Sequence, residues 1–304
     1  MSGTNAQLGF IGLGAMGQPM ATTLQASGFS VLGYDLNSQA LEQCAAQTGI
    51  SAASSPGEVF ERCDEIVCML PTSAHLEGLL FGAQPVKLRP GQLLIDMSSG
   101  EPSVTQGIGV RLRAQGAAMV DAPVSGNVVR ARKGDLAIML GGEEADCERA
   151  RKVLNPMARQ IFRTGGLGSG QAMKALNNLA SAAGFWIASE VLSIGKKLGI
   201  DPGVMVDVLN ASTGANNSTQ NKFRPFVLSG SYQAQFLLKL MVKDLGIAAN
   251  LAAQAKAPTP LTEQVVQLWG QALEDLGPQA DHTEVARLVS QRIGVDLRTQ
   301  EEQS

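Results

Sequence analysis

Lys174 and Asn178 stand four residues apart in the segment Gly170-Gln-Ala-Met-Lys-Ala-Leu-Asn-Asn178. In a helix, residues at this spacing share one face, so the two side chains would act on the same side. Their neighbours are mostly Ala, Leu and Met, among which a charged lysine is costly unless it is used or paired. A lysine can act as general acid or base when its surroundings lower its pKa, while the asparagine holds a substrate group. The pair predicts proton-transfer chemistry, although a solvated helix surface would show the same spacing.

A second pattern has the spacing GxGxxG, and it lies between an apolar segment at 7–11 and an amphipathic segment at 15–26. In a strand-turn-helix of this kind the first glycine allows a tight turn, the second lets a pyrophosphate approach, and the third lets the helix pack on the strand. The helix N-terminus then offers N–H groups to the phosphates. The candidate dinucleotide contacts are the six residues of this motif, Gly12, Leu13, Gly14, Ala15, Met16 and Gly17.

An acidic residue follows the next apolar segment. Asp35 comes directly after the expected strand at 30–34. A carboxylate at this point accepts hydrogen bonds from ribose hydroxyls and repels a 2′-phosphate. No Arg or Lys occurs at 36–39. The predicted cofactor is therefore NAD, with NADP less favoured.

Two polar segments follow later apolar strands. They are Asp96-Met-Ser-Ser-Gly-Glu-Pro102 and Asp121-Ala-Pro-Val-Ser-Gly126. In a doubly wound sheet, ligands bind at the carboxyl ends of the strands. Ser125 and Gly126 would suit a carboxylate, since they offer a hydroxyl and unhindered amides. Two ordinary polar turns without a binding role would show the same sequence pattern.

The elements that must position these residues change character near residue 165. Before it, short apolar strands alternate with amphipathic helices, which predicts an α/β Rossmann domain with a parallel sheet over 1–164. After it, a three- and four-residue apolar repeat predicts a long helix at 171–198, within an all-helical domain over 165–298. Residues 299–304 form a polar tail. The expected strands are 7–11, 30–34, 65–70, 92–95, 117–120 and 136–140, and the expected later helices are 204–211, 236–253, 261–276 and 282–292.

Composition excludes several classes of protein. The chain has 304 residues, 44% hydrophobic and 17% charged, with a net charge of −3, which argues against long disorder and against nucleic-acid binding. No apolar run is long enough for a membrane helix. Four cysteines and two histidines lack the spacing of a disulfide framework or a metal site, and no basic leader precedes Arg62. We expect a cytoplasmic protein without a metal.

The ordered set of motifs resembles the β-hydroxyacid dehydrogenases, the group of 3-hydroxyisobutyrate dehydrogenase, tartronate semialdehyde reductase and threonate dehydrogenase. The matching segments are GLGAMG at 12–17, MLPTS at 69–73, DMSSGEP at 96–102, DAPVSG at 121–126, GQAMKALNN at 170–178, KLMVKDLGIA at 239–248 and DHTEVARL at 281–288. The resemblance implies a Rossmann domain, a long interdomain helix and a helical domain, assembled as a homodimer or homotetramer. It implies that Lys174 is catalytic and that Ser125, Gly126 and Asn178 bind substrate. For the cofactor it implies contacts from Leu70, Pro71, Ser99 and Lys243, and His75 is a further candidate contact.

Two positions depart from the family pattern. Asn127 stands where a glycine is usual, and Arg130 adds a fixed charge close by. Both are candidate substrate contacts for an acid with more hydroxyls or a second anion, unless Arg130 points to solvent. Related decarboxylating 6-phosphogluconate dehydrogenases carry a glutamate where this chain has Ser181, and imine reductases lack the lysine found here as Lys174.

The residues and the resemblance together predict NAD-dependent oxidation of a short 3-hydroxy acid, or reduction of the matching semialdehyde. The substrate would be a small hydroxyacid. Reduction of glyoxylate, succinic semialdehyde or a sulfonated semialdehyde is the alternative within the family. A non-catalytic NAD-binding relative is a second alternative, which the presence of Lys174 disfavours.

Overall fold

The computed structural model describes residues 7–299 and divides into two compact units, Met1–Lys174 and Ala175–Ser304, called here the sheet unit and the helical unit. The division lies at Lys174 rather than at the expected residue 164, because the first turn of the long helix packs on the sheet through Asp121. Of the predicted polar tail, residues 300–304 lie outside the described part.

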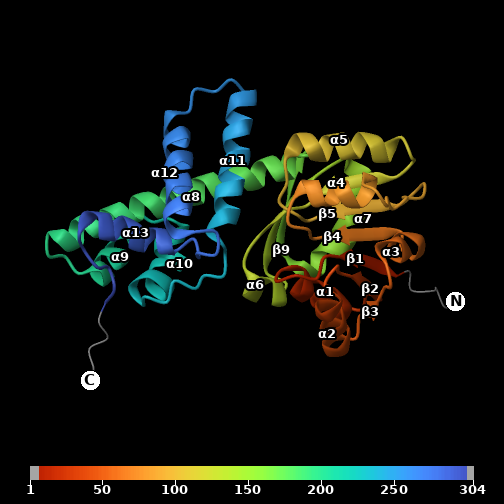
Figure 1. Cartoon of the computed structure of the whole chain (residues 1–304), viewed down its shortest axis with the longest axis horizontal. Helices are drawn as coiled ribbons and strands as arrows, with labels where there is room; N and C mark the ends of the chain where they lie inside the picture. Colours follow the sequence, from red (N-terminus) through yellow and green to blue (C-terminus); the bar gives the residue numbers. More distant parts are fainter. Residues whose placement is uncertain (1–6, 300–304) are drawn as a thin grey trace. The chain divides into compact units, whose positions relative to one another are not determined.

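The sheet unit is built on nine strands in the order β3-β2-β1-β4-β5-β6-β8-β7, with β9 beside β8 (Figure 1). The strands are β1 (Leu8–Ile11), β2 (Val31–Tyr34), β3 (Ser51–Ala52), β4 (Glu65–Cys68), β5 (Leu93–Asp96), β6 (Ala118–Asp121), β7 (Val124–Ser125), β8 (Leu136–Gly141) and β9 (Ala158–Gly165).

Strand direction confirms most of the predicted parallel sheet. All neighbours from β3 to β6 are parallel, and so are β8 and β9. The prediction is wrong for β8 against β6 and β7, which pair antiparallel. The connection from β7 to β8 is too short for the crossover that parallel neighbours need. Strands β3 and β7 have two residues each, and β9 is a partly exposed polar strand, so none gave an apolar signal.

Successive side chains along the strands pack alternately into two separate hydrophobic cores. Phe10 faces the core that contains residues of α1, α2 and α7, whereas Ile11 faces the core of α3, α4 and α5. Because successive strand residues point to opposite faces, two apolar layers require helices on both sides of the sheet. The helices of this unit are α1 (Gly17–Ala26), α2 (Ser38–Thr48), α3 (Pro56–Arg62), α4 (Ser73–Phe81), α5 (Pro102–Arg113), α6 (Val128–Arg132) and α7 (Glu144–Leu154).

The long helix α8 (Ser169–Lys197) begins in the sheet unit and continues into the helical unit, close to its predicted range. The helical unit packs Phe185, Phe223 and Trp269 at its centre, and the Phe185 and Phe223 rings stack with centroids 5.2 Å apart. Helices α11 and α12 lie side by side (Figure 1). The other helices are α9 (Pro202–Asn210), α10 (Asn217–Asn221), a π-helical turn (Phe223–Leu228), α11 (Leu238–Gln254), α12 (Pro260–Leu276) and α13 (Glu284–Ile293).

Two of these elements, α10 and the π-helical turn, were absent from the sequence prediction because each is too short to show a period. Beyond β9 the described residues form no further strand, as expected, apart from an isolated bridge between Leu237 and Asp281. Within residues 7–299, no helix combines the length and apolarity that a membrane crossing needs.

Candidate functional site

The carboxyl edge of the parallel strands collects most of the predicted residues of the sheet unit. Strands β1, β4, β5 and β6 are neighbours and run in one direction. Their ends lead into the glycine motif, Leu70–Ser73, Met97–Glu101 and Ala122–Gly126 respectively. The edge therefore places these four loops in a row, as the sequence pattern predicted.

The glycine motif forms an open cradle at this edge. Gly12 has a φ of +96°, a backbone conformation that favours glycine, and a side chain at Gly17 would collide with the Gly12 carbonyl. Gly14 differs, because a side-chain carbon there would meet no protein atom within 4 Å. Helix α1 begins beside it with no capping side chain at Met16 and no acidic residue in its first turn. Its N–H groups and an open backbone fit the diphosphate of a dinucleotide.

Asp35 lies next to this cradle. Its Oδ2 accepts a hydrogen bond of 2.6 Å from the Leu13 N–H, and its Oδ1 accepts one of 2.8 Å from the Asn37 N–H. The carboxylate is partly buried and holds the turn between the first two glycines. An acid at the end of β2 is thus bound to the loop that would carry the diphosphate.

The loops after β4 and β5 are tied to each other. The Leu70 N–H donates to Ser98 Oγ at 2.9 Å, and the Glu101 N–H donates to Ser73 Oγ at 2.8 Å. Ser99 lies in the second of these loops and is partly buried. The predicted residues Pro71 and His75 are exposed at the start of α4, where His75 Nδ1 lies 2.7 Å from Thr72 Oγ1.

The loop after β6 carries the predicted substrate residues. Ser125 belongs to β7 and pairs with Ala137, and exposed Gly126 follows it. Asn127 caps α6, since its Oδ1 accepts the Arg130 N–H at 3.0 Å. The Arg130 side chain is 45% exposed, and its Nε lies 3.4 Å from Asp135 Oδ2. Both departures from the family pattern therefore have partners inside the sheet unit.

Two buried carboxylates that sequence reasoning left without a role lie behind these loops. Asp96 and Asp121 end neighbouring strands in register, and both are fully buried. Asp121 accepts the Gly168 N–H at Oδ1 and the Gln171 N–H at Oδ2, each at 2.7 Å, and so holds the start of α8. Burial raises the pKa of Asp96 to about 7, and the charge of Asp121 adds to the rise, while hydrogen bonds from Ser98 lower it. Their only sequence signal was an acid at the end of an apolar strand.

Lys174 is the last residue of the sheet unit, one turn of α8 after Gln171. Its side chain is partly buried. Asn178 follows one turn later and is 6% exposed, and its Nδ2 donates to Asp244 Oδ2 at 2.6 Å. Lys243 Nζ lies 3.1 Å from Asp244 Oδ1.

Asp244 is a second residue that sequence reasoning missed. It is 2% exposed on α11, and it orients Asn178 by accepting from its amide nitrogen. The signal available was its position directly after Lys243 in a segment already singled out. The helical unit thus brings Asn178, Lys243 and Asp244 together, although only the first two were predicted.

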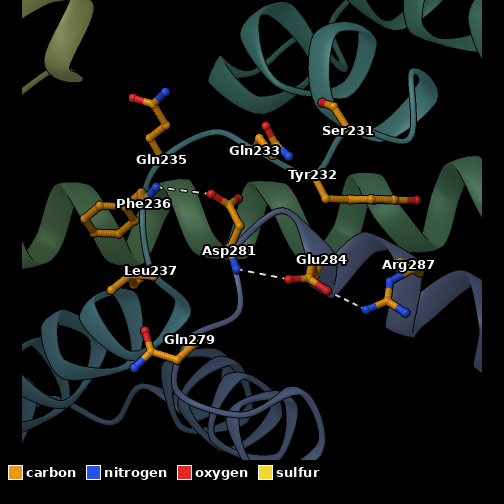
Figure 2. Close-up of a pocket in the computed structure, with 10 residues that line it drawn as sticks. All are labelled: Ser231, Tyr232, Gln233, Gln235, Phe236, Leu237, Gln279, Asp281, Glu284 and Arg287. Atoms are coloured by element: carbon orange, nitrogen blue, oxygen red, sulfur yellow. Dashed lines mark hydrogen bonds and ion pairs between the residues drawn. The ribbon is translucent and has the colours of Figure 1, made fainter.

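The helical unit also contains a cavity of about 710 Å³ (Figure 2). Its charged side chains are satisfied locally: Asp281 accepts the Phe236 N–H at 3.2 Å, and Glu284 accepts the Asp281 N–H at 3.1 Å and pairs with Arg287. None of the predicted site residues lines it. Among residues 7–299, no group of three or more His, Cys, Asp or Glu side chains is arranged so that it could hold a metal ion.

Comparison with known proteins gives two family models that together span most of the chain. Residues 7–166 match the NAD binding domain of 6-phosphogluconate dehydrogenase, and residues 168–289 match the NAD-binding region of NADP-dependent 3-hydroxyisobutyrate dehydrogenase.

Individual relatives agree with these models. The chain is 37% identical to bovine mitochondrial 3-hydroxyisobutyrate dehydrogenase, over 86% of this chain and 80% of that protein. It is 34% identical to the L-threonate dehydrogenase of Cupriavidus necator, over 86% and 89% respectively. Among solved structures, Mycobacterium tuberculosis 3-hydroxyisobutyrate dehydrogenase with L-serine matches with a TM-score of 0.83 and 30% identity, over 93% of this chain and 99% of that one. The chain belongs to the β-hydroxyacid dehydrogenase family of NAD(P)-dependent oxidoreductases.

Proposed function

We propose that this protein oxidises a short 3-hydroxy acid, or reduces the matching semialdehyde, with Lys174 as the general acid and base. The observation that carries the proposal is the attachment of the Lys174 helix to the edge that holds the glycine cradle. Asp121 fixes Gly168 and Gln171 at that edge, and Lys174 follows within one turn. Asn178 comes one turn later on the same helix.

The residues divide the chemistry between them. Bound NAD supplies the hydride acceptor. Lys174 takes the hydroxyl proton during oxidation and returns a proton to the carbonyl oxygen during reduction. Ser125, the backbone at Gly126 and Asn127, and Asn178 bind the carboxylate and orient the carbon that carries the hydroxyl. Asp244 supports this role by orienting the Asn178 amide.

The cofactor contacts proposed are those expected from sequence. The motif Gly12–Gly17 would hold the diphosphate, and Asp35 the adenosine ribose. Contacts further along the cofactor would come from Leu70, Pro71, His75, Ser99 and Lys243.

Replacing Asp35 by serine or arginine is expected to shift cofactor preference toward NADP. The substitution removes a charge that repels the 2′-phosphate, and arginine adds a partner for it. We expect the ratio of kcat/KM for NADP to kcat/KM for NAD to rise by at least tenfold, or about 1.4 kcal/mol. Initial rates with both cofactors measure this ratio. Asp64→Ser, at the opposite edge of the sheet, is the control, and a wild-type enzyme that prefers NADP would contradict the assignment.

The reaction itself is tested by a panel of substrates. The protein is incubated with NAD and 3-hydroxyisobutyrate, threonate or L-serine, and with NADH and glyoxylate, succinic semialdehyde or a sulfonated semialdehyde, while NADH absorbance is followed. Turnover of a 3-hydroxy acid supports the proposal, and turnover of glyoxylate alone favours the alternative. NADH binding without any turnover would favour a non-catalytic relative.

Arg130 is proposed to select substrates with a distal hydroxyl or anion. Such a group would compete with Asp135 for the exposed guanidinium. Arg130→Ala is expected to lower kcat/KM for such a substrate by about 1.5–3 kcal/mol, the range for hydrogen bonds to charged groups. It should change kcat/KM little for 3-hydroxyisobutyrate. Arg132→Ala on the same helix is the matched control. Equal losses of kcat/KM for both substrates in the Arg130 variant would show that Arg130 does not contact the substrate.

We further propose that the protein is a homodimer or homotetramer in the cytoplasm. Apolar side chains at 187, 191 and 194 repeat along one face of α8 and are 36–54% exposed, more than a lone helix face should leave to water, and Leu198, directly after the helix, is 76% exposed. Light scattering gives the mass of the assembly, which Ile194→Asp should lower.

The four cysteines are free and buried, which is consistent with the proposed location in a reducing compartment.

A further inference from the structure

The side-chain amide of Gln171 bonds to both ends of the loop that carries Ser99. Its Oε1 accepts the Gly100 N–H at 2.8 Å, and its Nε2 donates to the Ser98 carbonyl at 2.9 Å. Its Nε2 also lies 3.4 Å from Asp96 Oδ2. Gln171 is 1% exposed, so these groups have no water to replace a lost bond. Only one orientation of the amide satisfies all of them.

The loop held by Gln171 is connected in turn to the end of β4, through the hydrogen bonds of Ser98 with Leu70 and of Ser73 with Glu101. The backbone of Gln171 is held by Asp121 at the end of β6. One residue therefore joins the ends of β4, β5 and β6 to the first turn of α8.

Lys174 lies three residues after Gln171, an axial rise of about 4.5 Å. A shift of the first turn must carry Lys174 with it, and a displacement of about 1 Å can lower a rate 10²-fold. We propose that Gln171 is a positioning residue, which sets Lys174 relative to the Ser98–Gly100 loop. This inference rests on the proposed function, because it assumes the roles of Lys174 and Ser99.

The test compares two buried glutamines at opposite edges of the same sheet. Gln92 is also 1% exposed, and its amide bonds to the backbone of Arg89, Phe60 and Cys63. Methionine at either position keeps the length of the side chain and removes the hydrogen bonds. Gln171→Met is expected to lower kcat by about ten- to a hundredfold, while KM and the Kd for NADH change much less. Gln92→Met should lower the unfolding temperature similarly and leave kcat unchanged, and an equal loss of kcat in both variants would overturn the proposal.

Gln171→Glu separates positioning from packing by its pH profile. A protonated glutamic acid can still donate to Ser98 and accept from Gly100, whereas the ionised form has no donor and faces Asp96 and Asp121. The titratable groups around the position are these two acids, with Lys174 one turn later. The ratio of variant to wild-type kcat should be highest at acidic pH and fall with rising pH toward the Gln171→Met value. A ratio that does not depend on pH would contradict the role assigned to the amide.

Hydrogen exchange of the Gly100 amide tests the linkage without substrate. Exchange should be faster in Gln171→Met and unchanged in Gln92→Met, and an unchanged rate in both would overturn the proposal. If this linkage holds but Lys174→Ala retains full turnover, the proposed function fails and the positioning of α8 stands. If Lys174→Ala is inactive and Gln171→Met is fully active, only the present inference fails.

Discussion

Replacing Lys174 by alanine is expected to lower kcat by about 10²–10⁴-fold, the usual contribution of a general acid–base group. NADH affinity should stay nearly unchanged. The glycine cradle and Asp35 follow β1 and β2, while α8 is fixed to β6, and β4 and β5 lie between them in the sheet. The cradle that would carry the adenosine half of the cofactor therefore does not depend on Lys174.

Steady-state rates and a fluorescence titration with NADH measure the two effects separately. Lys196→Ala removes a lysine near the other end of the same helix and should leave both values unchanged. If the Lys174 variant kept more than roughly a tenth of the wild-type kcat, the proton-transfer role would be wrong.

The second large effect concerns the pH dependence of stability. Asp96 has a raised pKa of about 7 in the folded protein, against an ordinary value of 3.8, because it is fully buried, with the charge of Asp121 beside it. The folded state therefore holds the proton more tightly than the unfolded state between these two pH values. This contribution to stability is fully present below about pH 4 and is lost as the pH rises through 7. At about 1.4 kcal/mol per pH unit, the loss is of the order of 4 kcal/mol.

Asp96→Asn removes this titration while keeping the shape of the side chain. The free energy of unfolding of the variant, relative to wild type, should rise between pH 4 and pH 7 and then level off. Both tryptophans lie in the helical unit, so amide exchange of the β5 residues is the suitable measurement for the sheet unit. Asp64→Asn, an exposed acid, serves as control. If the free energy of unfolding changed with pH in the same way for the Asp96 variant and for wild type, Asp96 would already be ionised at pH 4.

Features of the site that depend only on residues close together in the chain could be predicted from the sequence. The glycine motif is one, because its three glycines are required by a single tight turn and by the helix that directly follows it. The pairing of Lys174 with Asn178 is another, since helical periodicity alone puts residues four apart on one face. The parallel strands β1, β4, β5 and β6 were also predictable, since buried strands read as apolar runs between turns. Their carboxyl ends then identified the edge where the loops gather.

Contacts between distant segments were decided only by the tertiary structure. Asp96 and Asp121 become neighbours through the register of β5 and β6, and Asn178 meets Asp244 across 66 positions of the chain. Asn127 is a helix cap and Arg130 pairs with Asp135, and neither contact was predicted from the sequence, which gave both residues as candidate substrate contacts and left open that Arg130 points to solvent. Sequence periodicity says which face of an element a residue occupies, but not which residue of another element will lie opposite. That choice depends on strand register and side-chain packing, which are set by the whole fold.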